Sequence, residues 1–113
     1  MESSDAIVVL AALAQETRLA AFRRLVEAGP GGLPAGEVAQ ALGVPHNTMS
    51  THLAALSRAG LITGRRQSRL VIYRAELARL GALGDFLLRD CCGGQPEICA
   101  AWPASSNPSR SAA

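Results

Sequence analysis

Three cysteines, confined to one short segment, are the residues in this chain best suited to chemistry. Cys91 and Cys92 are adjacent, Gly93 and Gly94 follow them directly, and Cys99 comes after a short loop. Thiolates are preferred by soft ions, and trivalent arsenic in particular takes three sulfur ligands in a pyramid. The two glycines free the backbone enough for the adjacent thiols to converge. The sequence therefore predicts a soft metal or metalloid site formed by these cysteines.

The same cysteines are open to three other interpretations. Free cysteine is often a small buried core residue. Cys99 can instead form a reversible disulfide with Cys91 or Cys92, which makes a redox switch. Three thiolates also suit Cd(II), Pb(II) or Zn(II), while a methylated trivalent arsenical needs only two. The third thiolate can come from the same chain or from a partner subunit.

Composition indicates one small domain with reduced thiols. The chain has 113 residues, of which 49% are hydrophobic and 4% aromatic, so one core is expected, built from Leu, Ala, Val and Ile. An odd number of cysteines argues against a disulfide framework. The first residues are acidic and polar, unlike a secretory signal, and no apolar run reaches membrane-spanning length. A cytoplasmic protein without a membrane partner is expected.

Hydrophobic periodicity predicts five helices, over residues 3–14, 16–28, 35–42, 46–59 and 76–90. Arg18, Arg23 and Arg24 are expected on the outward face of the second helix. The residues expected to face the core are Ile7, Leu10, Ala11 and Ala14 in the first helix, Leu19, Phe22, Leu25 and Val26 in the second, Val38, Ala39 and Leu42 in the third, Met49, Leu53 and Leu56 in the fourth, and Leu77, Leu80, Leu83, Leu87 and Leu88 in the fifth.

A helix-turn-helix followed by a hairpin is predicted in the middle of the chain. Gly43 separates the third and fourth helices, as in a helix-turn-helix. Residues 61–65 and 70–75 are rich in strand-forming types and flank a turn at Gln67 and Ser68, which predicts a β-hairpin. The expected fold is mainly α with a β-hairpin wing, a winged helix-turn-helix. Residues 1–92 are expected to form the DNA-binding and dimerisation domain, and residues 93–113 a mostly flexible tail carrying Cys99.

Three segments carry a family resemblance. They are Leu13–Leu19 (LAQETRL), Val44–Leu53 (VPHNTMSTHL) and Leu56–Ile62 (LSRAGLI). Together they strongly resemble the ArsR/SmtB family of metal-responsive repressors over about residues 5–90. The resemblance implies a homodimer that binds double-stranded operator DNA and leaves it when an inducer binds.

The resemblance also bears on the inducer. The family's best-known arsenic site is a Cys-x-Cys pair on the helix before the recognition helix, and residues 34–40 contain no cysteine. A zinc-type site on the last helix needs histidine, which that helix lacks. The C-terminal group of Cys91, Cys92 and Cys99 is similar to the arsenite-responsive branch. It implies As(III) as the inducer, with Sb(III) as a second one, and no organic cofactor. The alternative is a thiol-redox, persulfide-responsive or Cd/Pb-responsive repressor of the same fold.

Two groups of residues are candidates for DNA contact. A recognition helix reads bases with its outward N-terminal side chains. Basic side chains at a wing tip can reach phosphates or the minor groove. The expected contacts are Asn47, Thr48, Ser50, Thr51 and His52 on the helix, Arg58 after it, and Arg65, Arg66 and Arg69 on the wing. The helix residues can instead form a solvated face with a cap, and the arginines a solubilising hairpin tip. His52 can instead be a structural hydrogen-bonding residue, and Arg58 can pair with Glu76.

No set of residues indicates an enzyme. The chain has no Cys-x-x-Cys motif and no glycine-rich phosphate loop, and no third group is placed to orient His46 or His52. An arsenate reductase would need an anion site before the cysteines, and nothing there supplies one. We therefore expect a regulator rather than a catalyst.

Overall fold

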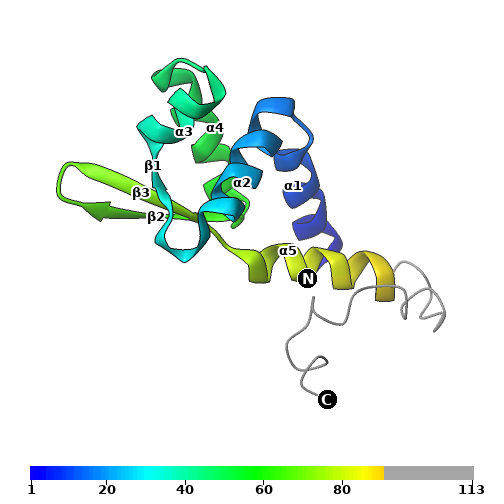
Figure 1. The fold of residues 1–113 in the computed structure, drawn as a ribbon. Coiled ribbons are helices and arrows are strands. Elements are labelled where there is room, and N and C mark those ends of the chain that lie inside the picture. Colours follow the sequence, from blue (N-terminus) through cyan, green and yellow to red (C-terminus); the bar gives the residue numbers. More distant parts are fainter. Residues whose placement is uncertain (91–113) are drawn as a thin grey trace. The chain divides into compact units, whose positions relative to one another are not determined.

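A computed structural model describes residues 1–90 of the chain (Figure 1). Residues Glu2–Leu77 form one compact unit, and the helical residues from Ala78 onward belong to a second. Cys91, Cys92 and Cys99 lie outside the described residues, and so does the predicted boundary between residues 92 and 93. The cysteine site and the tail therefore stay predictions.

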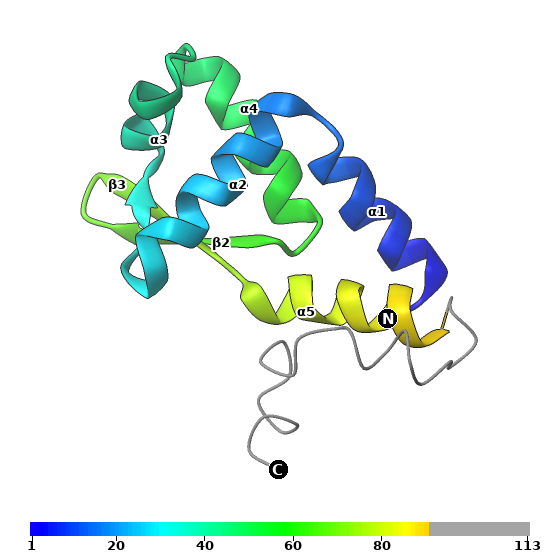
Figure 2. The same cartoon turned by 45° about the vertical axis from the view of Figure 1, so that its right-hand side comes forward.

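The predicted fold class is confirmed: helices dominate, and an antiparallel hairpin follows the helix-turn-helix (Figures 1 and 2). Among the described residues, no helix is long and apolar enough to span a membrane. The elements in order are α1 Ser3–Leu13, α2 Glu16–Ala28, the 3₁₀ turn η1 Gly29–Gly31, β1 Leu33–Pro34, α3 Ala35–Leu42, α4 His46–Arg58, β2 Ile62–Gln67, β3 Leu70–Ala75, α5 Leu77–Asp85 and the π-helical turn η2 Phe86–Asp90.

The helix-turn-helix packs as its periodicity predicts. Met49, Leu53 and Leu56 are fully buried and form what we call the core row of α4. The turn between α3 and α4 contains Gly43 at φ +65°, a left-handed conformation that glycine adopts without steric cost. The backbone N–H of Val44 donates to the carbonyl oxygen of Ala39 at 3.0 Å and closes the turn. The core row thus holds α4 with its opposite face outward.

The predicted inward face of α1 is wrong. The buried residues are Ala6, Val9 and Ala12, while Ile7 is 65% and Leu10 43% exposed. α1 contacts both α2 and α4, and a stripe of small side chains lets helices approach closely. The larger apolar side chains are consequently left on the outside. Three further core predictions also differ, because Leu19 of α2 is exposed, and Val26 of α2 and Leu42 of α3 are only half-buried.

The wing contains a strand that the sequence did not predict. β1 pairs with β3, and the antiparallel sheet has the order β1-β3-β2. Periodicity cannot reveal a strand of two residues, and Pro34 is tolerated there because β1 is at the sheet edge. Gly32, at φ +70°, makes the approach possible: a Cβ atom on it would lie 2.2 Å from the Tyr73 carbonyl oxygen.

The last helix is shorter than predicted. The α-helix ends at Asp85, and residues Phe86–Asp90 form a π-helical turn instead of continuing it. Leu83 is buried, but Leu77, Leu80 and Leu87 are exposed. The leucines expected in the core thus form, in part, an apolar surface of the single chain.

Candidate nucleic-acid interface

The N-terminal half of α4 presents a row of small polar side chains to solvent. Successive residues of a helix point about 100° apart, so Asn47 and Thr51 point away from the core row. Thr48 and Ser50 flank them, and all four are exposed. We call these four residues the polar face of α4. The structure thus places the four expected base-contacting residues of the recognition helix together on one accessible surface.

Two hydrogen bonds order this face. The backbone N–H of Thr48 donates to Oδ1 of Asn47 at 2.9 Å, and the Thr51 hydroxyl donates to the Asn47 carbonyl oxygen at 3.3 Å. The first satisfies one of the N–H groups that a helix start leaves without a partner. The Asn47 amide keeps two N–H donors and the Thr51 hydroxyl keeps its acceptor lone pairs. These are groups that can bind base edges or phosphates.

His52 lies at the border between this face and the core. It is half-buried, and its Nδ1 atom lies 3.5 Å from Nη1 of Arg18. Nε of Arg18 also donates to the carbonyl oxygen of Ala12 at 2.7 Å. The predicted outward position of Arg18 is therefore wrong, since its guanidinium turns back against α1 and α4. This geometry supports the structural alternative for His52.

The wing arginines do not form one cluster. Arg65 and Arg66 are neighbours on β2, so their side chains project from opposite faces of the sheet. Arg69 lies in the two-residue turn beside Ser68, which has φ +61°. All three arginines are exposed. The structure thus distributes positive charge around the wing, where sequence order alone suggests a single patch.

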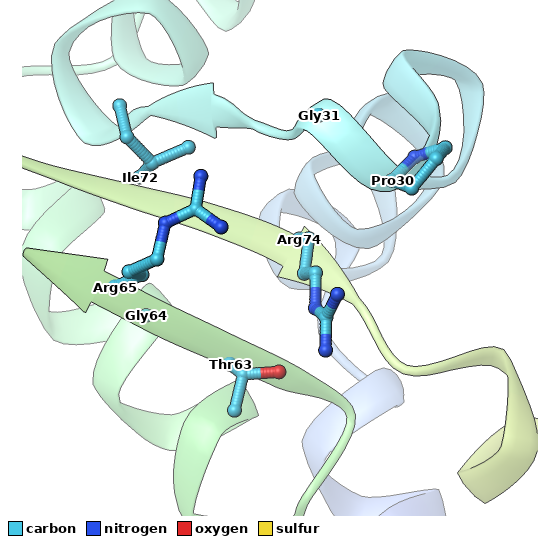
Figure 3. Close-up of a pocket in the computed structure, with 7 residues that line it drawn as sticks. All are labelled: Pro30, Gly31, Thr63, Gly64, Arg65, Ile72 and Arg74. Atoms are coloured by element: carbon cyan, nitrogen blue, oxygen red, sulfur yellow. The ribbon is translucent and has the colours of Figure 1, made fainter. Parts of the chain in front are cut away.

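Arg65 instead shares a face with Arg74, a residue not among the predicted contacts. Both line a cavity of about 200 Å³ beneath η1, and Figure 3 shows both guanidinium groups on the same side of the β2–β3 hairpin. The cross-strand pairs Thr63–Arg74 and Arg65–Ile72 bring them together. Only the strand register could have revealed this neighbour in the sequence.

Glu76 is bound at the base of the wing. Its carboxylate accepts a hydrogen bond from the Thr63 hydroxyl and lies 3.3 Å from Nε of Arg74. The Thr63 hydroxyl and the Arg74 guanidinium together hold the pKa of Glu76 below its usual range. Arg58 is exposed, and Glu76 pairs with Arg74 instead of with it. Within residues 1–90, the Arg58 guanidinium is thus accessible to a phosphate.

Comparisons with known proteins agree with this geometry. A helix-turn-helix domain family model (HTH_20) matches residues 13–65. The transcriptional activator HlyU of Vibrio cholerae is 32% identical over 90 residues, which cover 80% of this chain and 81% of HlyU. An ArsR-like transcriptional regulator from Rhodococcus sp. RHA1 has a solved structure with 29% identity and a TM-score of 0.71, over 86% of this chain and 89% of that one. The chain belongs to the ArsR family of transcriptional regulators.

Two further structures resemble this ArsR-family regulator. Reduced HlyU has a TM-score of 0.63 and 32% identity, over 80% of this chain and 92% of that one. The homodimeric winged helix-turn-helix domain of Mb0332 from Mycobacterium bovis has a TM-score of 0.62 and 28% identity, over 82% of this chain and 86% of that one. Within residues 1–90 of the present chain, no three histidine, cysteine or acidic side chains gather as a metal site would require.

Proposed function

We propose that this ArsR-family regulator is a repressor that binds double-stranded operator DNA as a homodimer. The observation that carries the proposal is the polar face of α4, held outward by the buried core row and followed by a wing with arginines on both faces. Asn47, Thr48, Ser50 and Thr51 are proposed to read bases. Arg58, Arg65, Arg66 and Arg69 are proposed to bind phosphates or the minor groove.

The dimer is proposed to form through apolar side chains that the single chain leaves exposed. On α1 these are Ile7, Val8 and Leu10, which are 65%, 49% and 43% exposed. On α5 and the turn after it, Leu77, Leu80 and Leu87 are exposed as well. Exposed apolar side chains grouped on helices are typical of association surfaces. The homodimeric state of the similar Mb0332 domain supports a homodimer for this chain as well.

The inducer is proposed to be As(III), and also Sb(III), bound by the thiolates of Cys91, Cys92 and Cys99. Support comes from the sequence: three soft ligands lie within nine residues, directly after the last described helix. Binding would remove the thiol protons, whose reference pKa is about 8.5, and tie the tail to the end of that helix. A coupling of roughly 1–3 kcal/mol between inducer and DNA, about 5–150-fold in affinity, is the usual scale.

A thiol switch is the second candidate. The solved structures that resemble this chain include one of reduced HlyU. In the present chain, an oxidant would take two electrons from Cys99 and either Cys91 or Cys92 to form a disulfide, and two protons would be released. A persulfide donor would instead transfer its outer sulfur to one of these thiolates and leave as a thiolate. Cd(II) or Pb(II) at the same cysteines is the remaining alternative.

The proposal is tested with an operator obtained by selecting a random duplex library with the full-length reduced protein. Fluorescence anisotropy then measures binding while arsenite, antimonite, Cd(II), Pb(II), a mild oxidant and a persulfide donor are added in parallel. We expect arsenite to release the DNA at about one equivalent per subunit. Each of Cys91→Ser, Cys92→Ser and Cys99→Ser should bind the operator normally and lose this response.

Each other outcome changes a definite part of the proposal. Release by oxidant or persulfide alone, reversed by a reducing agent, replaces the metalloid inducer with the thiol switch. Release by Cd(II) or Pb(II), with no release by arsenite, would identify a Cd/Pb-responsive regulator. If the selection enriches no duplex and Asn47→Ala binds random DNA as well as the unmodified protein does, operator recognition by α4 is wrong.

A further inference from the structure

We propose that Arg18 is a positioning residue that sets the recognition helix α4 against the C-terminal end of α1 through His52. This role rests on the proposed operator binding, which it extends by naming a residue of α2 behind the DNA-facing surface. Arg18 belongs to the LAQETRL segment, to which neither the fold nor the proposed DNA contacts assigned a task.

The first part of the arrangement is the end of α1. The last carbonyl groups of a helix have no partner within it, and they carry partial negative charge. The last turn of α1 has no basic residue. From α2, Arg18 supplies both hydrogen-bond donors and a positive charge to this helix end. Its Nε donates to the Ala12 carbonyl oxygen at 2.7 Å and its Nη2 to the Ala11 carbonyl oxygen at 3.4 Å. The α1–α2 corner is further closed by Gln15, whose side chain accepts from the Arg18 backbone N–H at 2.8 Å.

The second part is the contact with α4. Nη1 of Arg18 lies 3.5 Å from Nδ1 of His52, in a partly buried position. An arginine side chain has donors and no acceptor, so Nδ1 of His52 must be the unprotonated, accepting nitrogen. The ring proton of neutral His52 is then on Nε2. Arg18 therefore selects both the orientation of the imidazole and its tautomer.

One guanidinium group thus connects three helices. α1, α2 and α4 contact one another, and Figure 2 shows α2 and α4 beside α1. α1 also carries the exposed Ile7, Val8 and Leu10 of the proposed dimer surface. Through Arg18, this helix is joined to His52, one residue beyond the polar face of α4.

A pair of substitutions at His52 separates this role from direct DNA contact. His52→Asn keeps an acceptor near the position of Nδ1 and removes the Nε2 donor. His52→Gln keeps a donor near the position of Nε2 and removes the acceptor for Arg18. We expect His52→Gln to weaken operator binding about three- to tenfold more than His52→Asn, because only His52→Gln loses the hydrogen bond from the charged Arg18 guanidinium.

Substitutions at Arg18 complete the test. Arg18→Gln should weaken operator binding at least as much as His52→Gln, because it also removes the hydrogen bonds to the Ala11 and Ala12 carbonyl oxygens. The double variant should bind no worse than Arg18→Gln alone, because the contact with His52 is already lost there. Arg18→Lys should restore part of the loss. Arg23→Gln is the matched control, since it removes the same charge from an exposed position of the same helix. Long-range ¹H–¹⁵N spectra of the imidazole should show the Nε2–H form in the unmodified protein and a mixed signal in Arg18→Gln.

Several results would overturn the assignment. If His52→Asn binds worse than His52→Gln, His52 contacts DNA directly through Nε2. Additive losses in the double variant, or an unchanged imidazole spectrum in Arg18→Gln, would show that the two residues are not coupled. Losses equal to that of Arg23→Gln would reduce Arg18 to a surface charge. If the unmodified protein binds no selected duplex, the proposed function itself is rejected. That result is distinct from those of the variants, which test only the role of Arg18.

Discussion

The recognition helix and the wing, although both are proposed to contact DNA, are held in place by different forces. Every residue of the core row of α4 is fully buried. In β2 only Ile62 is buried, and residues 63–67 are all exposed. α4 is therefore fixed by apolar burial, whereas the wing depends on backbone geometry and a few polar contacts at its base. The two regions should respond to different substitutions.

The largest effect is expected from Leu53→Ala in the core row. Leu53 has no exposed surface, so its removal leaves a cavity and costs roughly 3–5 kcal/mol of the free energy of unfolding. Denaturant unfolding measures the loss, and operator binding should fall with the folded fraction. Leu70→Ala in the wing, where Leu70 is 53% exposed, is the control and should change stability by less than about 0.5 kcal/mol. Equal losses in the two variants would contradict the contrast drawn between the regions.

The wing should instead be destabilised most by a substitution that changes its backbone conformation. In Gly32→Ala, the new Cβ would lie 2.2 Å from the Tyr73 carbonyl oxygen and the residue would have φ +70°, so β1 must separate from β3. We expect a loss of about 3 kcal/mol, measured by denaturant unfolding.

The neighbouring glycine provides the matched control. A Cβ atom on Gly31 would have no other atom within 4 Å, and the φ of Gly31 is not left-handed. Gly31→Ala should therefore be neutral or slightly stabilising. Similar losses in the two alanine variants would show that glycine is needed in this turn for its flexibility and not for the close approach of Gly32 to Tyr73.

The sequence predicted the regions fixed by periodic burial better than those fixed by close approach. The core row of α4 follows from apolar residues at helical spacing, and it was correct. The buried stripe of α1 was not, because Ala6 and Ala12 carry too weak an apolar signal beside Ile7 and Leu10. β1 was missed because it has two residues and its pairing with β3 is a long-range contact.

Candidate site residues divide in the same way. The polar face of α4 follows from helical spacing alone, because its residues are near one another in the chain. Arg74 beside Arg65 requires the strand register, and the inward turn of Arg18 requires the corner between α1 and α2. Charge and residue type gave no hint that Arg18 differs from Arg23. Contacts between segments distant in sequence were thus the part that pattern could not supply.

Replacing serine with glycine should change the stability in opposite directions in the two regions. Ser68 in the wing turn has φ +61°, which glycine adopts more readily than serine. Ser68→Gly should stabilise the protein by up to about 1 kcal/mol. Ser57→Gly, within α4, should destabilise it by about 0.5 kcal/mol, because glycine is a poorer helix former than serine. Thermal unfolding of both variants gives the two signs, and a loss in Ser68→Gly would mean that the turn gains nothing from glycine.

The smallest effect is expected at the base of the wing, where Glu76 accepts from Thr63 and pairs with Arg74. The folded-state pKa of Glu76 is lowered, first by the Thr63 hydroxyl and then by Arg74. The ionised carboxylate therefore stabilises the fold at pH values above the ordinary glutamate pKa, and this stabilisation is lost as the pH falls through the lowered value. Glu76→Gln should remove that part of the acid dependence of unfolding, and Thr63→Val should reduce it. Glu27→Gln, which removes an acid paired with Arg24 on the exposed side of α2, controls for net charge. If Glu76→Gln and Glu27→Gln change the acid unfolding curve equally, the Thr63–Glu76–Arg74 contacts do not help hold the wing.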